Sequence, residues 1–271
     1  MADPPSLYGV DLKVARANRD LADLKESIAS ALHPDRYRIS VERDPQTKNY
    51  VYRVYDVPAV EPDWLLQAGE ILYQLRSALD HLAWQLVVLD GGSPSDKTQF
   101  PVRDSPLDRK GNARPLGTLM PEIKDPQILD LLNQCQPYSG TGLEQLTRSE
   151  AREQPLWRLR VLNNIDKHRL LLIAVCALDL GTLWWALPQG VANPLFRLNT
   201  VGLKDGTPIA WFDFKGAEPP PNFDPHPALQ VVIREPDAAR ISHVNITDAL
   251  SQLCWWVETH ILAMRFRPLF P

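Results

Sequence analysis

The sequence of 271 residues lacks the short patterns that identify common sites. Its three cysteines stand in apolar stretches without a C-x-x-C pair, so we expect small core residues and no disulfide framework or zinc site. No G-x-G-x-x-G, G-x-x-x-x-G-K-[ST], H-E-x-x-H or G-x-S-x-G string occurs. Dinucleotide-binding, P-loop, zincin and α/β-hydrolase functions therefore have no support, and we expect no cofactor and no metal.

An excess of basic residues and a long apolar run are also missing. Asp and Glu outnumber Lys and Arg by 33 to 29, so a nucleic-acid partner would have to use a local basic patch. The apolar stretch 170–187 is interrupted by Asp179 and Gly181, whereas a membrane span needs about 20 apolar residues. The N-terminus has no basic segment followed by an apolar run. We expect a cytoplasmic protein without a membrane partner.

Apolar periodicity and turn residues predict an α+β fold. Helices are expected over 9–32, 63–90, 125–134, 155–177 and 245–264. The hairpin 36–57 and strands within 182–235, among them 182–187, supply an antiparallel sheet. Because strands and helices do not alternate, a parallel doubly wound sheet is disfavoured. The prediction is a single intertwined domain, 1–271, in which a helical bundle (mainly 63–177, plus the helix 245–264) packs with the antiparallel sheet.

The predicted helix 63–90 has two distinct sides. Its apolar side is a row of leucines at helical spacing: Leu72, Leu75, Leu79, Leu82, Leu86 and Leu89. The roughly opposite side carries Tyr73, Ser77, Asp80 and Trp84, and it is flanked by Arg76 and His81. Arg76 and Asp80 are four residues apart and can form an ion pair along the helix.

A second stretch, 155–175, places charges where its period asks for apolar side chains. Asp166 and Arg169 follow Leu159 and Leu162 on the same stripe. Buried charges need partners, so we expect this helix to pack on 63–90 and to bring these two residues to Arg76 and Asp80. The cluster would be extended by Asn163, Asn164, Lys167 and His168. Such a network can also be a purely structural lock between helices, and both interpretations stay open.

The string "RSALDH" resembles the R-x4-H motif of the HEPN superfamily, whose members are helical bundles and often metal-independent ribonucleases that act as dimers. "LRSALDHLAWQL", "TQFPV", "QPY" and "LNNIDKHRLL" are together similar to a set of uncharacterised bacterial proteins, over roughly residues 65–175. Only Arg76 and His81 match the HEPN motif. The "NNIDKHR" residues belong to the longer similarity alone.

The resemblance implies a metal-independent endoribonuclease or RNA-binding protein. His81 would move a proton, and Arg76 would hold the phosphate, alone or together with Lys167 or Arg169. Either Asp80 or Asp166 would orient the cations. Six Lys or Arg against three Asp or Glu in 148–169 provide a local basic strip. RNA is therefore one expected partner and a second copy of the chain another. The binding residues would be Tyr73, Trp84, Asn163, Asp166, Lys167, His168 and Arg169. The alternatives are a non-catalytic homodimer that binds a small molecule or a protein, or one whose charges only lock an interface.

Overall fold

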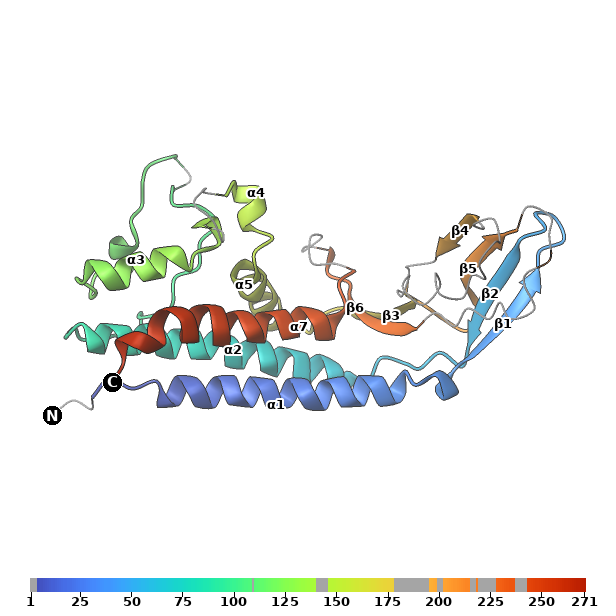
Figure 1. Cartoon of the computed structure of the whole chain (residues 1–271), viewed down its shortest axis with the longest axis horizontal. Coiled ribbons are helices and arrows are strands. Elements are labelled where there is room, and N and C mark those ends of the chain that lie inside the picture. The colour runs from blue at the N-terminus through green and yellow to red at the C-terminus, as the bar shows by residue number, and fades with distance from the viewer. Residues whose placement is uncertain are drawn as a thin grey trace. The chain divides into compact units, whose positions relative to one another are not determined.

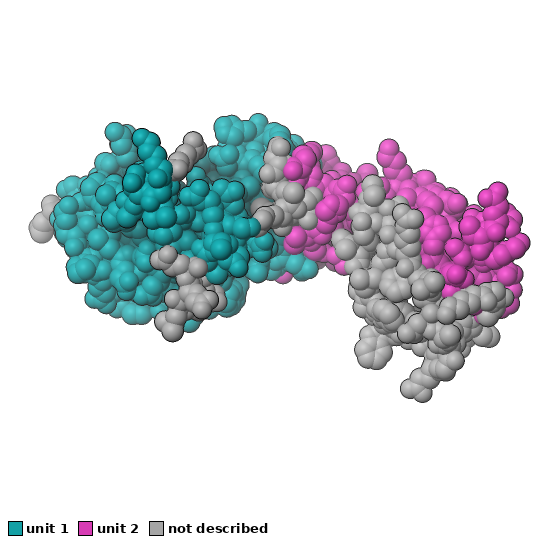
Figure 2. Space-filling view, turned by 90° about the horizontal axis from the view of Figure 1, so that it is seen from above, with its two compact units in different colours: residues 1–24, 65–171, 247–271 teal, residues 25–64, 172–246 magenta. Residues whose placement is uncertain are grey.

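The computed structural model describes residues 4–108, 110–139, 146–177, 195–198, 202–214, 218, 228–236 and 243–271. They form helices and antiparallel sheets, which confirms the α+β class. The chain divides into two compact units whose segments alternate along the sequence (Figure 2). Unit 1 comprises residues 1–24, 65–171 and 247–271, and unit 2 comprises 25–64 and 172–246. That the two units make one domain stays a prediction.

The long helices of unit 1 come from both ends and the middle of the chain. In Figure 1, the helices α1 (Tyr8–Ala31), α2 (Pro62–Leu89) and α7 (Ile246–Trp255) run side by side. α7 continues as a π-helix over Trp256–Phe266. Asn18 donates to Glu258 at 2.9 Å, and Arg267 pairs with Asp11, so the first helix is tied to the last.

The leucine side of α2 is the centre of unit 1, as predicted. Its first five leucines are completely buried, and Ala78 and Ala83 fill the spaces between them. Burying one leucine contributes roughly 1.5–3 kcal/mol, so this row explains why the helix stays intact over 28 residues. The helix ends where Gly91 adopts a positive φ of 73°, which glycine tolerates without strain.

Shorter helices and a long connection complete unit 1. The helices are α3 (Pro126–Gln134), α4 (Arg148–Ala151) and α5 (Pro155–Asp166), with single 3₁₀ turns at Leu116–Thr118, Pro137–Ser139 and Arg267–Leu269. The buried side chain of Gln136 donates to Pro101 O at 2.9 Å and accepts from Arg103 N at 3.0 Å. This glutamine anchors the "TQFPV" segment beside α3.

Unit 2 holds two antiparallel sheets. The larger has the order β1-β2-β5-β4, from β1 (Arg38–Arg43), β2 (Tyr50–Tyr55), β5 (Thr207–Asp213) and β4 (Leu195–Leu198). Tyr52 packs edge-on against Phe212 across β2 and β5, with ring centres 5.2 Å apart. The smaller sheet pairs β3 (Ile173–Ala177) with β6 (Leu229–Ile233). A 3₁₀ turn at Pro34–Arg36 precedes β1.

Three predictions about elements need correction. The helix expected over 155–177 ends at Asp166, and residues 173–177 form β3, because their backbone groups pair with β6. Because β6 pairs with β3, it does not join the sheet of the hairpin 36–57. The strands β5 and β4 do extend that sheet, as predicted. In the helix predicted over 245–264, the spacing of the apolar residues Val257, Ile261 and Met264 predicts one stripe, but Met264 is 64% exposed. The strand expected at 182–187 lies outside the described residues.

The three cysteines are buried and unpaired, as predicted. No helix in the described ranges combines the length and the apolar character needed to cross a bilayer.

Candidate functional site

The predicted ion pair on α2 is formed, and it also holds a second segment of the chain. Arg76 Nη2 donates to Asp80 Oδ1 at 2.7 Å and to Phe100 O at 2.9 Å. The same Asp80 oxygen accepts from Phe100 N at 2.9 Å. The pair therefore satisfies both main-chain groups of Phe100 and fixes the connection beside the helix.

A second arginine is bonded to the same segment from another helix. Arg160, on α5, donates from Nη1 to Val102 O at 2.8 Å. Arg76 and Arg160 thus hold carbonyls that are two residues apart. Burial is the main cause that lowers the pKa of Arg160; Asp104 opposes it, and the positive charge of Arg76 adds to it.

Around these two arginines lies a groove of about 980 Å³ with a large excess of positive charge. Nine Lys or Arg line it against two Asp, an excess of seven charges. The cations are Arg76, Lys97, Arg103, Lys110, Arg114, Arg148, Arg152, Arg160 and Lys167. One of the acids, Asp104, is shared by two cations, at 2.8 Å from Arg152 and 3.8 Å from Arg148. We call this surface the basic groove.

Trp157 and main-chain carbonyls hold the cations of the basic groove in place. The guanidinium carbons of Arg160 and Arg152 lie 4.8 and 5.6 Å from the centre of the Trp157 ring, within range of cation–π attraction. Arg103 donates to the carbonyl oxygens of Arg114 and Leu107. A guanidinium has five N–H donors, so these bonds leave others free for a ligand.

Asn163, a predicted binding residue, lines the basic groove from α5 and is only 5% exposed. Its side-chain amide is not among the buried polar groups that lack a hydrogen-bond partner in the described part of the chain. Asn164 and Lys167 line the same groove and are exposed. The structure therefore brings Asn163 and Lys167 together with Arg76, as the sequence predicted.

His81 does not line the basic groove. It lines a separate pocket of about 330 Å³ with Asp80, Trp84, Gln85 and Thr98. Its Nδ1 faces α1, where a Cβ at Gly9 would lie 3.2 Å away. Arg76 and His81 are therefore in different pockets, and Asp80 is the residue that connects them.

The aromatic side chains predicted to line the site on α2 are exposed. Tyr73 is 51% exposed, with the Lys13 ammonium 5.6 Å from its ring centre, and Trp84 is 43% exposed. Tyr8 and Leu12 of α1 are exposed by 71% and 52%. The polar side of α2 and the neighbouring face of α1 thus present apolar area to solvent.

The predicted network of Asp166 and Arg169 with Arg76 and Asp80 does not form. Asp166 packs over α2 at Gly69, where an added Cβ would lie 2.5 Å from its Oδ1, two helical turns before Arg76. It makes no ion pair in the described part of the chain, and burial together with the charge of Glu70 raises its pKa. Arg169 lies beyond the end of α5 and is exposed, because the helix stops before it.

His168, also a predicted binding residue, is exposed in the turn that follows α5 and does not line the basic groove. Sequence reasoning missed Lys97, Arg103, Lys110 and Arg114 as site residues. They lie on the connection 97–114, which has neither a helical nor a strand period. Their recurring positive charge is the signal that could have identified them.

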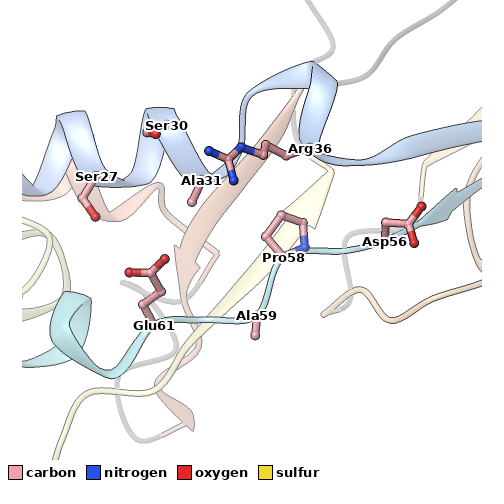
Figure 3. Close-up of a pocket in the computed structure, with 8 residues that line it drawn as sticks. All are labelled: Ser27, Ser30, Ala31, Arg36, Asp56, Pro58, Ala59 and Glu61. Carbon is pink, nitrogen blue, oxygen red and sulfur yellow. The ribbon is translucent and has the colours of Figure 1, made fainter.

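Unit 2 has a pocket of its own, of about 470 Å³ (Figure 3). Arg36 and Glu61 stand on opposite sides of it, and Ser27 and Ser30 of α1 line another wall. Asp56, which has a positive φ of 58°, also lines it and lies 3.7 Å from Arg38. One cation and two carboxylates line this pocket, so it has no excess of positive charge.

No three His, Cys, Asp or Glu side chains gather in a metal-binding arrangement within the described residues. Comparison of the chain with protein-family models, curated proteins and solved structures finds no match. The resemblance to the HEPN superfamily therefore stays a prediction.

Proposed function

We propose that unit 1 binds single-stranded RNA through the phosphates of its backbone, in the basic groove. The observation that carries the proposal is the excess of seven positive charges in one recess of a chain whose formal net charge is −4. Proteins that bind single strands track the phosphates with such cation-lined grooves. A flexible single strand can enter a recess, whereas a duplex has to lie across it.

The cations of the basic groove are suited to phosphate in geometry as well as in charge. Arg76, Arg103 and Arg160 are fixed by bonds to main-chain carbonyls and keep unused N–H donors. Because these side chains are already ordered, binding costs less conformational entropy than it would for free arginines. Trp157 contacts two guanidiniums, so it supports phosphate binding, and we expect little dependence on base sequence.

Metal-independent cleavage of RNA is the further part of this proposal. A general base has to come within hydrogen-bond reach of the ribose hydroxyl, about 2.6–3.2 Å. His81 lines the neighbouring pocket, next to Asp80, so a strand held at Arg76 would have to extend past Asp80 to reach it. Binding is therefore the part that the geometry supports best.

Fluorescence anisotropy with a labelled single-stranded RNA in EDTA tests both parts. We expect binding that weakens steeply between about 50 and 200 mM salt, with a slope near −0.7 per phosphate contact. Gel analysis of the same samples reports cleavage, which His81→Ala should abolish without weakening binding. Absence of salt-sensitive binding would refute the proposal, whereas binding without cleavage would leave an RNA-binding protein.

A second candidate function is self-association through α1 and α2. Tyr8, Leu12, Tyr73 and Trp84 expose apolar area that a second copy of the chain could cover. Sedimentation velocity should then show a dimer that Trp84→Glu dissociates. The matched control is Met264→Glu, at a more exposed apolar side chain on the C-terminal π-helix, which should leave the dimer intact. A monomer at all concentrations would exclude this function.

A further inference from the structure

Two arginines form a fixed pair on one wall of the basic groove. Arg76 comes from α2 and Arg160 from α5, and each is hydrogen-bonded to the segment between them, at Phe100 O and Val102 O. The side chain of Arg76 is only 13% exposed. The pair is therefore held in position before any ligand arrives.

The pair is short of negative charge. Asp80 pairs with Arg76, but Arg160 has no ion-pair partner in the described part of the chain. Asp104, the nearest acid that affects Arg160, is committed to Arg148 and Arg152. Two like charges held close together are unfavourable unless an anion binds between them.

Asn163 adds an amide to the two arginines. It lies three residues after Arg160 on α5, so both side chains emerge from the same face of the helix. The residue is only 5% exposed and lines the basic groove. A side-chain amide in that position can donate to and accept from a ligand that enters the groove.

We propose that Arg76, Arg160 and Asn163 form a pocket for a terminal phosphate, the phosphomonoester at one end of an RNA strand. A phosphomonoester carries about −1.5 to −2 charges at pH 7 and three free oxygens. Two guanidiniums and one amide offer three donor groups and two positive charges. An internal phosphodiester has one charge and two free oxygens, so it would leave part of the pocket unused. This inference rests on the proposed RNA-binding function and specifies its substrate.

The test compares three forms of one RNA sequence: with a 5′-phosphate, with a 3′-phosphate and with hydroxyl groups at both ends. Anisotropy of the full chain should show one phosphorylated form binding about tenfold more tightly than the hydroxyl form. Asn163→Ala should reduce that ratio to about one while changing the affinity for the hydroxyl form less than about twofold. Asn18→Ala, on α1 outside the basic groove, is the matched control and should keep the ratio.

Because Asn163 is buried, thermal unfolding has to show that its variant is folded. Arg160→Lys is a second variant; it keeps the charge but loses the planar fork of donors, and it should also lower the ratio. Equal, salt-sensitive binding of all three RNA forms would overturn the terminal-phosphate pocket and leave the RNA-binding function intact. Absence of binding by any form would overturn both.

A competition experiment with inorganic phosphate completes the test. Millimolar phosphate should compete only with the phosphorylated RNA and thereby abolish the difference between the forms. If inorganic phosphate alone binds as tightly as the phosphorylated RNA, the ligand is the free ion and the inference is wrong.

Discussion

The basic groove of unit 1 and the pocket of unit 2 differ in the balance of positive and negative side chains that line them. Nine cations and two acids line the groove, whereas Arg36, Glu61 and Asp56 together line the pocket (Figure 3). In the groove, Arg103 and Arg160 are fixed by uncharged carbonyls, so their charge is left for a ligand. We expect the partners of the arginines, together with their number, to decide whether such a surface binds an anion.

The largest effect on RNA binding is expected when two arginines of the basic groove lose their charge. Arg76→Gln combined with Arg160→Gln should weaken RNA binding by about 100-fold at low salt, because two charge-assisted contacts are lost. Glutamine keeps a donor for each carbonyl, so the fold should persist. Anisotropy titration measures the loss, and Arg36→Gln in the pocket of unit 2 is the control. An equal loss in that control would mean that the groove is not the binding surface.

Acid should destabilise unit 1 through His260. This buried histidine stacks on Trp256 at 3.8 Å; burial, aided by the charge of Arg265, lowers its pKa from 6.5 to about 4. The unfolded chain binds a proton at this histidine more readily than the folded chain does. The contribution of the neutral histidine to the free energy of unfolding is therefore fully present above pH 6.5 and is lost as the pH falls toward 4. Between pH 7 and 5 the loss is about 1–2 kcal/mol.

Denaturant unfolding at both pH values measures this loss. His260→Phe should remove it, whereas His33→Gln, at an exposed site of unit 2, should not. If the His260 variant loses as much stability between pH 7 and 5 as the parent protein, other groups cause the loss.

Asp166→Asn should stabilise the protein slightly. The pKa of this carboxyl is raised by burial and by Glu70, so the charged form is disfavoured in the folded state. The cost of the charged carboxylate in the folded state is absent at low pH, where the group is protonated, and is complete above the pKa of the folded state. After solvent screening, this cost is under about 1 kcal/mol at pH 7. The unfolding midpoints of variant and parent should differ at pH 7 and converge at low pH. Marked destabilisation by Asn would indicate an ion pair after all.

The smallest effect is expected for a paired charge on the sheet of unit 2. Glu42 lies 3.1 Å from Arg53 and is 54% exposed. Glu42→Gln should change the free energy of unfolding by less than about 0.5 kcal/mol, because exposed ion pairs contribute little. A loss above about 1 kcal/mol in urea unfolding would show that unit 2 depends on its surface charges.

The sequence predicted the elements with strong periodicity. The leucine row of α2, the hairpin and the Arg76–Asp80 pair depend on spacings within one segment, and all three are present. The end of α5 was not predictable, because no proline or glycine interrupts 156–177. There the chain leaves the helix to pair with β6, more than fifty residues later.

The site was predicted only in part for the same reason. Arg76, Asn163 and Lys167 meet in the basic groove, but four of its nine cations come from the connection 97–114, which has no period. Tertiary bonds to Gln136 and Asp80 shape that connection. The R-x4-H spacing places His81 about 140° around the helix from Arg76, where it faces Gly9 of α1 and lines a different pocket.

The contact between Asp11 and Arg267 joins residues that are 256 positions apart. During synthesis, α1 leaves the ribosome long before α7 and the final turn exist. At about 5–20 residues per second, its apolar side waits roughly 10 to 50 s for those partners. The part of α1 that contacts these residues therefore stays uncovered until α7 and the final turn have been synthesised.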